Sequence, residues 1–257
     1  MSTVAVTGGT GTLGREVVGA LAAGGHDVVV TSRSTSSVRN GVRTVRVDYR
    51  SPAGLAAAFD GVDAVVHCAT SALGRHGGEV ELTRRVLTAA RTAGCGHLVY
   101  ISIVGVDRIP LPYYRSKHAT ERLVEDGGVP WTVLRATQFH ELVVRLLSGV
   151  TRPPLAFVPD LPVQPVAATE VGARLAALAT APPSGRAPDL GGPEVATLPD
   201  LARRYLAAVG RRRRVRPIGL FGSVYAGYRA GYHLAPEHAV GTITFADHLD
   251  AHVRPSR

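Results

Sequence analysis

The chain has 257 residues, of which 45% are hydrophobic and 19% charged; this composition is typical of a folded protein with a large apolar core and excludes disorder. Basic residues outnumber acidic ones by 29 to 20, so the net charge is +9, although Lys117 is the only lysine. No apolar run is long enough for a membrane helix, the N-terminus has no signal-peptide pattern and the two cysteines form no CxxC pair, so we expect a cytoplasmic protein that does not bind a membrane.

Short β-branched runs alternate with amphipathic helical stretches over the first half of the chain. The expected strands are 4–7, 27–31, 42–47, 64–68, 98–103 and 131–135, and the expected helices are 11–23, 55–59, 79–93 and 114–125. Continuous Val-rich strands separated by helices favour a parallel sheet that is covered on both faces. Right-handed crossovers then make an α/β fold with a doubly wound, Rossmann-like sheet.

The alternation loosens after Phe139. Five prolines between 153 and 165 exclude a single regular element there, and three further helices are expected at 168–179, 198–209 and 245–253. We therefore predict a doubly wound domain over residues 1–150. A smaller cap region that binds the substrate is predicted over residues 151–257, interleaved with the sheet edge.

A glycine-rich segment connects the first predicted strand to the first predicted helix. Its glycines follow the spacing Gly-x-x-Gly-x-x-Gly, which permits a tight turn, close approach of the backbone to a diphosphate and close helix–strand packing. The free N–H groups at the positive end of the helix then face the phosphates. The residues predicted to bind the cofactor here are Gly8, Thr10, Gly11, Thr12, Leu13 and Gly14. Residues 1–150 thus form the predicted NAD(P)-binding domain.

The residues after the second predicted strand indicate which dinucleotide binds. An enzyme that prefers NAD(H) places an acidic residue there, on the ribose 2′-hydroxyl. This chain has Ser32, Arg33 and Ser34 instead. A guanidinium can bind a 2′-phosphate through two parallel hydrogen bonds, and the hydroxyls can donate beside it. We therefore predict NADP(H) as the cofactor, in preference to NAD(H).

The candidate catalytic residues are Ser102, Tyr113 and Lys117. Tyr113 and Lys117 are four residues apart on a predicted helix and so share a face. Ser102 ends a predicted strand, at the sheet edge where open α/β sheets assemble their sites. A nearby cation stabilises a phenolate and brings the phenol closer to the pH at which it can pass a proton to a carbonyl.

With these residues the sequence resembles the short-chain dehydrogenase/reductase superfamily, in the extended or atypical branch that includes NmrA-like and NAD(P)H-binding proteins. The resemblance also rests on residues 68–71 and 131–139 and covers about residues 3–180. It implies that Ser102 holds the substrate carbonyl, that Tyr113 is the acid/base, and that Lys117 binds the nicotinamide ribose and tunes Tyr113. The further cofactor-binding residues that it implies are Asp48, at the adenine, and Ala69, Thr70, Ser71 and Thr137.

The sequence departs from this family in one helix. Many members carry a proton-relay Asn in the helix after the fourth strand, whereas the only Asn of this chain is Asn40 and the corresponding stretch offers Thr83. Tyr114 also adjoins Tyr113, so spacing alone assigns the catalytic ring.

The remaining polar residues carry less specific signals of function. Gln138, Phe139 and His140 follow the sixth strand and are expected to line the substrate pocket. The scattered histidines lack metal-ligand spacing, so we expect no metal. The run 211–214 is all arginine without interleaved aromatics; we expect a solvated face and no nucleic acid, although an anionic substrate or carrier protein stays open.

Three functions are compatible with these residues. The first is an NADP-dependent, short-chain-type oxidoreductase that reduces a carbonyl of a small organic substrate, such as a secondary metabolite. The second is an NmrA-like redox sensor that binds NADP(H) without turnover. The third is an epimerase or dehydratase that uses the nicotinamide transiently. The Tyr113/Lys117 pair favours the first. The sequence does not indicate the oligomeric state.

Overall fold

The structure is a computed structural model that describes residues 1–32, 37–39, 42–49, 52–70 and 78–253. The chain forms two compact units, each built from separate segments of the sequence. The first unit contains Met1–Ser102, Pro112–Arg135 and Thr169–Pro188, and the second contains Ile103–Leu111, Ala136–Ala168 and Asp189–Arg257. Because neither unit is one continuous segment, the assignment of functions to 1–150 and 151–257 stays a prediction.

The first unit is organised around a mostly parallel sheet, in the order β10-β7-β6-β5-β1-β2-β4-β3. Its strands are β1 (Thr3–Thr7), β2 (Asp27–Ser32), β3 (Ser37–Arg39), β4 (Val42–Arg46), β5 (Ala64–His67), β6 (His97–Ile103), β7 (Trp131–Ala136) and β10 (Gly185–Arg186). The short β3 pairs antiparallel with β4, whereas β1 pairs parallel with both β2 and β5. The strand order reverses around β1, as in a doubly wound sheet, so the predicted Rossmann-like α/β class is confirmed.

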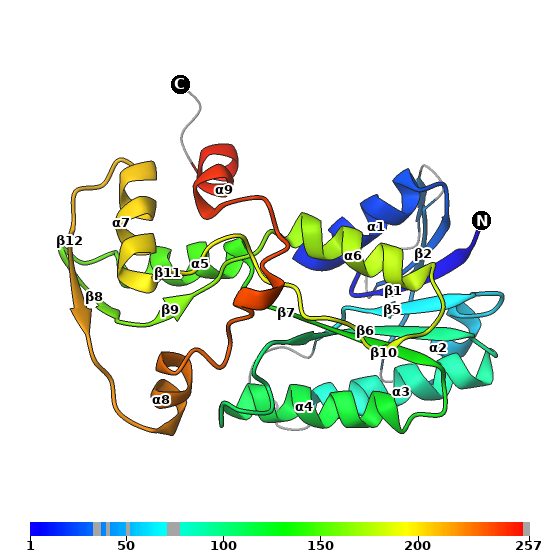
Figure 1. Cartoon of the computed structure of the whole chain (residues 1–257). Coiled ribbons are helices and arrows are strands. Elements are labelled where there is room, and N and C mark those ends of the chain that lie inside the picture. The colour runs from blue at the N-terminus through cyan, green and yellow to red at the C-terminus, as the bar shows by residue number, and fades with distance from the viewer. Residues whose placement is uncertain (33–36, 40–41, 50–51, 71–77, 254–257) are drawn as a thin grey trace. The chain divides into compact units, whose positions relative to one another are not determined.

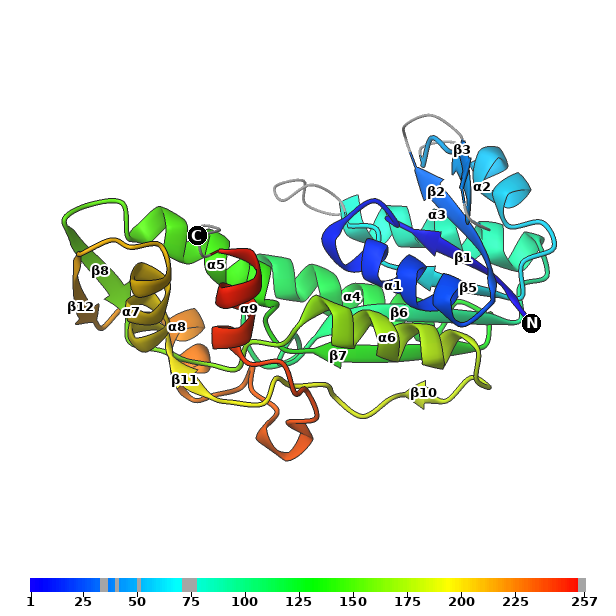
Figure 2. The ribbon, with the colours of Figure 1, turned by 90° about the horizontal axis from the view of Figure 1, so that it is seen from above.

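Helices cover both faces of this sheet. They are α1 (Thr12–Ala23), α2 (Pro52–Ala58), α3 (Gly78–Thr92), α4 (Pro112–Glu125) and α6 (Ala168–Ala179). Helices α1 and α6 lie on one face, and α2, α3 and α4 lie on the other (Figure 1). A view from above shows α1 and α6 side by side (Figure 2). The absence of a side chain at Gly172 of α6 permits this close packing, since a Cβ there would lie 2.6 Å from Glu16 Cβ. Buried apolar side chains such as Phe59 and Leu98 fill the core against α2 and α3.

The second unit has its own apolar core and two small sheets. Its elements are α5 (His140–Val150), β8 (Leu155–Pro159), β9 (Pro162–Val163), β11 (Ala196–Thr197), α7 (Leu198–Ala208), β12 (Arg214–Ile218), α8 (Ser223–Arg229), the 3₁₀ turn Pro236–His238 and α9 (Phe245–His252). Strand β8 pairs parallel with β12, and β9 pairs antiparallel with β11. Arg211–Arg214 are exposed at and before the start of β12.

Helix α5 is the main difference from the expected elements. No helix was expected directly after Phe139, yet α5 begins at His140. Val143 and Leu147, one helical turn apart, are buried in the core of the second unit. Leu146, between them in sequence, is 52% exposed. The buried positions 140, 143 and 147 follow helical spacing, so the sequence carried the signal for this helix and the prediction missed it.

Candidate cofactor and catalytic site

The glycine turn between β1 and α1 has the geometry that its spacing predicts. Gly8 has a φ of +68°, and a Cβ there would lie 2.7 Å from the backbone nitrogen of Ala69. A Cβ at Gly14 would lie 2.2 Å from the carbonyl oxygen of Gly8. At Gly11 a Cβ would meet only that same oxygen, at 3.2 Å, and Gly11 is exposed. Gly8 and Gly14 are thus required for chain packing, whereas Gly11 leaves the backbone open to a ligand.

The first turn of α1 fits a dinucleotide diphosphate. The helix begins at Thr12, and the residue before it, Gly11, provides no side-chain cap. The N–H groups of Thr12, Leu13 and Gly14 have no acceptor within the helix, as in the first turn of any α-helix. They lie at the positive end of the helix dipole, where anions are stabilised. These residues are therefore suited to hold the diphosphate of the cofactor.

Tyr49, which the sequence did not single out, supports this turn. The backbone N–H of Gly8 donates to the Tyr49 hydroxyl at 3.3 Å. That hydroxyl lies 2.7 Å from Thr31 Oγ1 and donates to the Thr31 carbonyl at 3.0 Å. Tyr49 therefore ties the turn to the end of β2. It comes directly after Asp48, but a single tyrosine after a short strand is no recognisable signal in sequence.

Some of the other predicted cofactor residues lie at or after strand ends in the described part of the chain. Ser32 is buried at the end of β2, Ala69 is buried after β5, and Thr70 and Asp48 are exposed. Arg33, Ser34 and Ser71 lie outside the described residues. Thr137 belongs to the second unit, where it is buried and its hydroxyl accepts a hydrogen bond from the Gly192 N–H at 3.4 Å.

Two of the predicted catalytic side chains come from α4 and one from β6. Tyr113 is partly buried, and Lys117, one turn later, is 3% exposed. Ser102 is 2% exposed, and its hydroxyl has no hydrogen-bond partner among the described residues. The ammonium of Lys117 donates to the carbonyl oxygen of Ile101, the residue before Ser102, at 3.3 Å. The structure thus brings Lys117 to the end of β6 where Ser102 lies.

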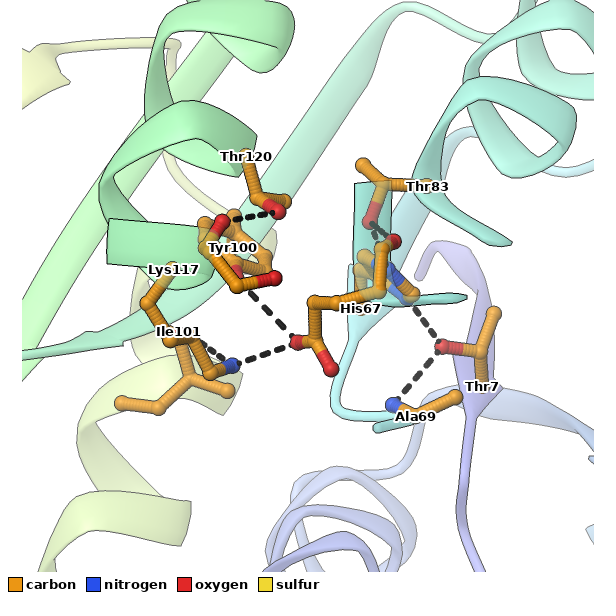
Figure 3. A network of polar contacts seen from close by, with 10 residues as sticks. Thr7, His67, Ala69, Thr83, Tyr100, Ile101, Lys117 and Thr120 are labelled. Carbon is orange, nitrogen blue, oxygen red and sulfur yellow. Dashed lines mark hydrogen bonds and ion pairs between the residues drawn. The ribbon is translucent and has the colours of Figure 1, made fainter. Parts of the chain in front are cut away.

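Lys117 has partners that the sequence analysis missed (Figure 3). Its Nζ is 2.9 Å from Oε1 of Glu79, the second residue of α3, and both side chains are buried. Nζ also lies 4.7 Å from the centroid of the Tyr100 ring. The Tyr100 hydroxyl donates to the same Glu79 oxygen at 3.4 Å. One signal was available: a single lysine in a buried position needs an acidic partner.

These surroundings shift the pKa values of the cluster. Burial raises the pKa of Tyr113 above its ordinary value, the Lys117 ammonium lowers it and Glu79 raises it again. Burial alone would lower the pKa of Lys117, but Tyr100 and Glu79 outweigh burial and raise it. At neutral pH Tyr113 therefore carries its proton and Lys117 its charge, as an acid and its supporting cation require.

A second buried network lies beside the first (Figure 3). His67, at the end of β5, is 2.7 Å from Thr7 Oγ1 through Nδ1 and 2.9 Å from Thr83 Oγ1 through Nε2. Thr7 Oγ1 also accepts a hydrogen bond from the Ala69 N–H at 3.2 Å. Burial, reinforced by Lys117, lowers the pKa of His67 to about 3. Thr83 is therefore engaged with a neutral histidine.

The residues predicted to line the substrate pocket belong to the second unit. Gln138 donates to the carbonyl of His233 at 3.1 Å and accepts from the N–H of Gln164 at 3.2 Å. Phe139 is partly exposed. His140 has no exposed surface; its Nε2 lies 3.1 Å from the Ile243 carbonyl oxygen. Substrate roles for these three residues stay predictions, and His140 offers a ligand no surface in this structure.

The described ranges contain neither a metal-binding cluster nor a membrane-spanning helix. No three His, Cys, Asp or Glu side chains gather there in a way that could hold a metal ion. None of the helices in those ranges combines the length and apolar character that crossing a bilayer requires.

Comparison with known proteins identifies the family. Residues 8–142, more than half of the chain, match the protein family described as NAD(P)H-binding. The chain belongs to the NAD(P)H-binding family. This confirms the predicted recognition and the predicted binding of a nicotinamide dinucleotide.

Relatives of this NAD(P)H-binding protein are named as reductases. It is 33% identical over 84% of its length to (4-alkanoyl-5-oxo-2,5-dihydrofuran-3-yl)methyl phosphate reductase of Streptomyces griseus, of which it covers 77%. It is 29% identical over 54% of its length to quinone oxidoreductase 2 of Escherichia coli, and that alignment spans about half (49%) of the relative. It is 27% identical to NAD(P)H azoreductase of Xenophilus azovorans, covering 84% of this chain and 77% of that one.

Solved structures share the fold. The E. coli NADPH-dependent quinone oxidoreductase QOR2 in complex with NADPH has a TM-score of 0.80 at 19% identity, covering 96% of this chain and 99% of that one. Triphenylmethane reductase of Citrobacter sp. with NADP(H) has a TM-score of 0.70 at 20% identity, covering 98% and 95%. At these identities the likeness confirms the Rossmann-like fold.

The open backbone at Gly11 leads to a prediction for cofactor binding. Gly11→Val places a branched side chain where the diphosphate approaches, so we expect NADPH to bind at least about tenfold more weakly while the protein still folds. Gly19→Val is the matched control, because a Cβ at Gly19 on the same helix would meet no other packed segment of the described residues within 4 Å. Calorimetric titration with NADPH, together with circular dichroism, measures both effects. Undiminished binding to a folded Gly11→Val variant would contradict this role.

Proposed function

We propose that this protein is an NADPH-dependent reductase of a carbonyl group in a small organic substrate. The observation that carries the proposal is the placement of Tyr113, partly buried and protonated at neutral pH, one helical turn from the buried ammonium of Lys117. The unpartnered hydroxyl of Ser102 adds a free donor at the end of the neighbouring strand. Membership of the NAD(P)H-binding family and the reductase and oxidoreductase names of its relatives support NAD(P)H-dependent reduction in general.

Each of the proposed catalytic residues has a separate role in the reduction. When bound, NADPH supplies the hydride that adds to the carbonyl carbon. The Tyr113 hydroxyl gives its proton to the carbonyl oxygen, so that the product is an alcohol, and Ser102 orients that oxygen by a hydrogen bond. The positive charge of Lys117 stabilises the phenolate that Tyr113 becomes, until water returns the proton.

The proposed cofactor contacts extend from the glycine turn. Ser32, Arg33 and Ser34 would bind the 2′-phosphate and Asp48 the adenine. The strand ends would contribute the remaining contacts, from Ala69, Thr70, Ser71 and Thr137.

The proposal is tested by NADPH oxidation against a substrate panel. The names of the relatives guide the panel: an alkanoyl-oxo-dihydrofuran phosphate, quinones and an azo dye, beside simple ketones and aldehydes. Turnover that consumes one NADPH per product supports a reductase. Tight NADPH binding without turnover on any compound would overturn it in favour of a redox sensor. Substrate conversion without net NADPH consumption would overturn it in favour of an epimerase or dehydratase.

Cofactor preference gives a second test. Because Arg33 stands where an acidic residue would select NAD(H), NADPH is expected to bind at least about tenfold more tightly than NADH, a difference of about 1.4 kcal/mol. Arg33→Asp removes the guanidinium and repels the 2′-phosphate, so the preference should vanish or invert. Arg43→Asp makes the same charge change at an exposed position of β4 and serves as the control. Equal dissociation constants for the two cofactors in the parent protein would refute the preference.

A further inference from the structure

The only lysine of the chain is held in a fully protein-lined environment. Lys117 is 3% exposed, so its ammonium cannot rely on water. Among the described residues it contacts Glu79 Oε1 at 2.9 Å and the Ile101 carbonyl oxygen at 3.3 Å, and the Tyr100 side chain lies beside them. A buried charge with this little access to water is stable only with an opposite charge and hydrogen bonds.

Glu79 joins three elements through one carboxylate. It lies on α3 and is 2% exposed. Its Oε1 contacts Lys117 of α4 and accepts the hydroxyl of Tyr100 from β6. These contacts fix where the ammonium lies relative to β6, the strand that contains Ser102.

The other titratable groups that act on Lys117 are neutral at pH 7. These groups are Tyr100 of β6, Tyr113 of α4, His67 of β5 and Cys68, which directly follows β5. Burial raises the pKa of both tyrosines, raises that of Cys68 to about 12 and lowers that of His67 to about 3. Within the described part of the chain, the negatively charged group that pairs with Lys117 is therefore the carboxylate of Glu79.

We propose that Glu79 is a positioning residue of the reductase, which holds the Lys117 ammonium in place and keeps it charged while Tyr113 meets the substrate. This role rests on the proposed function. In this role the Glu79 carboxylate of α3 acts on the catalytic residues through Lys117 and does not contact the substrate.

The single lysine allows a direct test without cofactor or turnover. Protein grown with ¹³C-labelled lysine gives one Lys side-chain NMR signal, and the shift of its Cε carbon reports protonation of Lys117. In the parent the signal should not titrate below pH ~10. In Glu79→Gln it should titrate at least ~2 pH units lower than in the parent, because burial then acts without a compensating anion. A Glu79→Gln signal that titrates as in the parent overturns the proposal.

Glu121→Gln is the matched control. Glu121 is equally buried, at 2% exposure, and pairs with Arg135, so its loss removes another buried carboxylate of the same unit. In Glu121→Gln, the NMR signal of Lys117 should titrate at the same pH as in the parent. Where Glu79→Gln does not fold, Glu79→Asp is used instead. It keeps the negative charge on a side chain that is one methylene shorter and therefore farther from Lys117. Its midpoint should then lie below that of the parent, and a midpoint equal to the parent's also overturns the proposal.

The pH profile of turnover separates positioning from mere stability. Reduction needs Tyr113 protonated and Lys117 charged, so loss of Glu79 should move the alkaline limb of kcat to lower pH. A purely structural role would lower activity at all pH values and leave the shape of the profile unchanged. If the parent shows no turnover, the proposed function fails, while the NMR titration still decides whether Glu79 holds the charge of Lys117.

Discussion

Replacing Tyr113 by Phe is expected to lower turnover with NADPH by roughly 10²–10⁴-fold, the usual contribution of general acid catalysis. The substitution keeps the ring and its packing and removes only the hydroxyl that would deliver the proton. NADPH affinity should stay nearly unchanged, because the diphosphate-binding role is proposed for the glycine turn and not for Tyr113. Steady-state kinetics with the best substrate of the panel and calorimetric NADPH binding measure the two quantities.

Two variants test the assignment of roles around Tyr113. Tyr114→Phe is the matched control; Tyr114 is 5% exposed, and its ring centroid lies 6.5 Å from that of Tyr113. It should leave turnover nearly unchanged. Lys117→Arg should not retain activity, since a wide planar guanidinium cannot take the place of a compact ammonium between Glu79 and the Ile101 carbonyl. Loss of activity in Tyr114→Phe with retention in Tyr113→Phe would reverse the assignment of the two rings.

Arg135→Met is expected to lower the free energy of unfolding by about 3–5 kcal/mol, the cost of breaking a buried ion pair from one side. Arg135 of β7 binds Glu121 of α4 through two hydrogen bonds, Nε to Oε1 at 2.7 Å and Nη2 to Oε2 at 2.5 Å. The two residues are 9% and 2% exposed, so methionine leaves a carboxylate buried without its partner. Urea unfolding followed by circular dichroism measures the loss.

Arg84→Met is the control for this ion pair. Arg84 pairs with Glu81 at 3.6 Å on the surface of α3, where both side chains are more than half exposed. Such pairs contribute about 0–1 kcal/mol, so this variant should unfold close to the parent. Equal stability of Arg135→Met and the parent would show that the buried pair contributes nothing net to folding.

The parallel sheet and the cofactor turn could be predicted because their signals are local. A Val-rich strand, three glycines and an amphipathic helix occupy one continuous segment, and each glycine has a steric reason that spacing alone conveys. The candidate proton donor and its cation were predictable for the same reason, since Tyr113 and Lys117 are four residues apart on one helix. By contrast, α5 was missed although its buried residues His140, Val143 and Leu147 follow helical spacing, so a local signal for it was present in the sequence.

What the sequence by itself determined is therefore the fold class, the glycine turn between the first strand and the first helix, and the placement of Tyr113 and Lys117 one turn apart on one helix. Tertiary structure alone decided what surrounds them. Glu79 lies 38 positions before Lys117, and Tyr49 reaches back to Gly8 across β2. Neither contact follows a helical or strand period, because each joins separate elements of the sheet. The state of a buried charge depends on the groups that folding brings around it, and no local pattern in the chain records them.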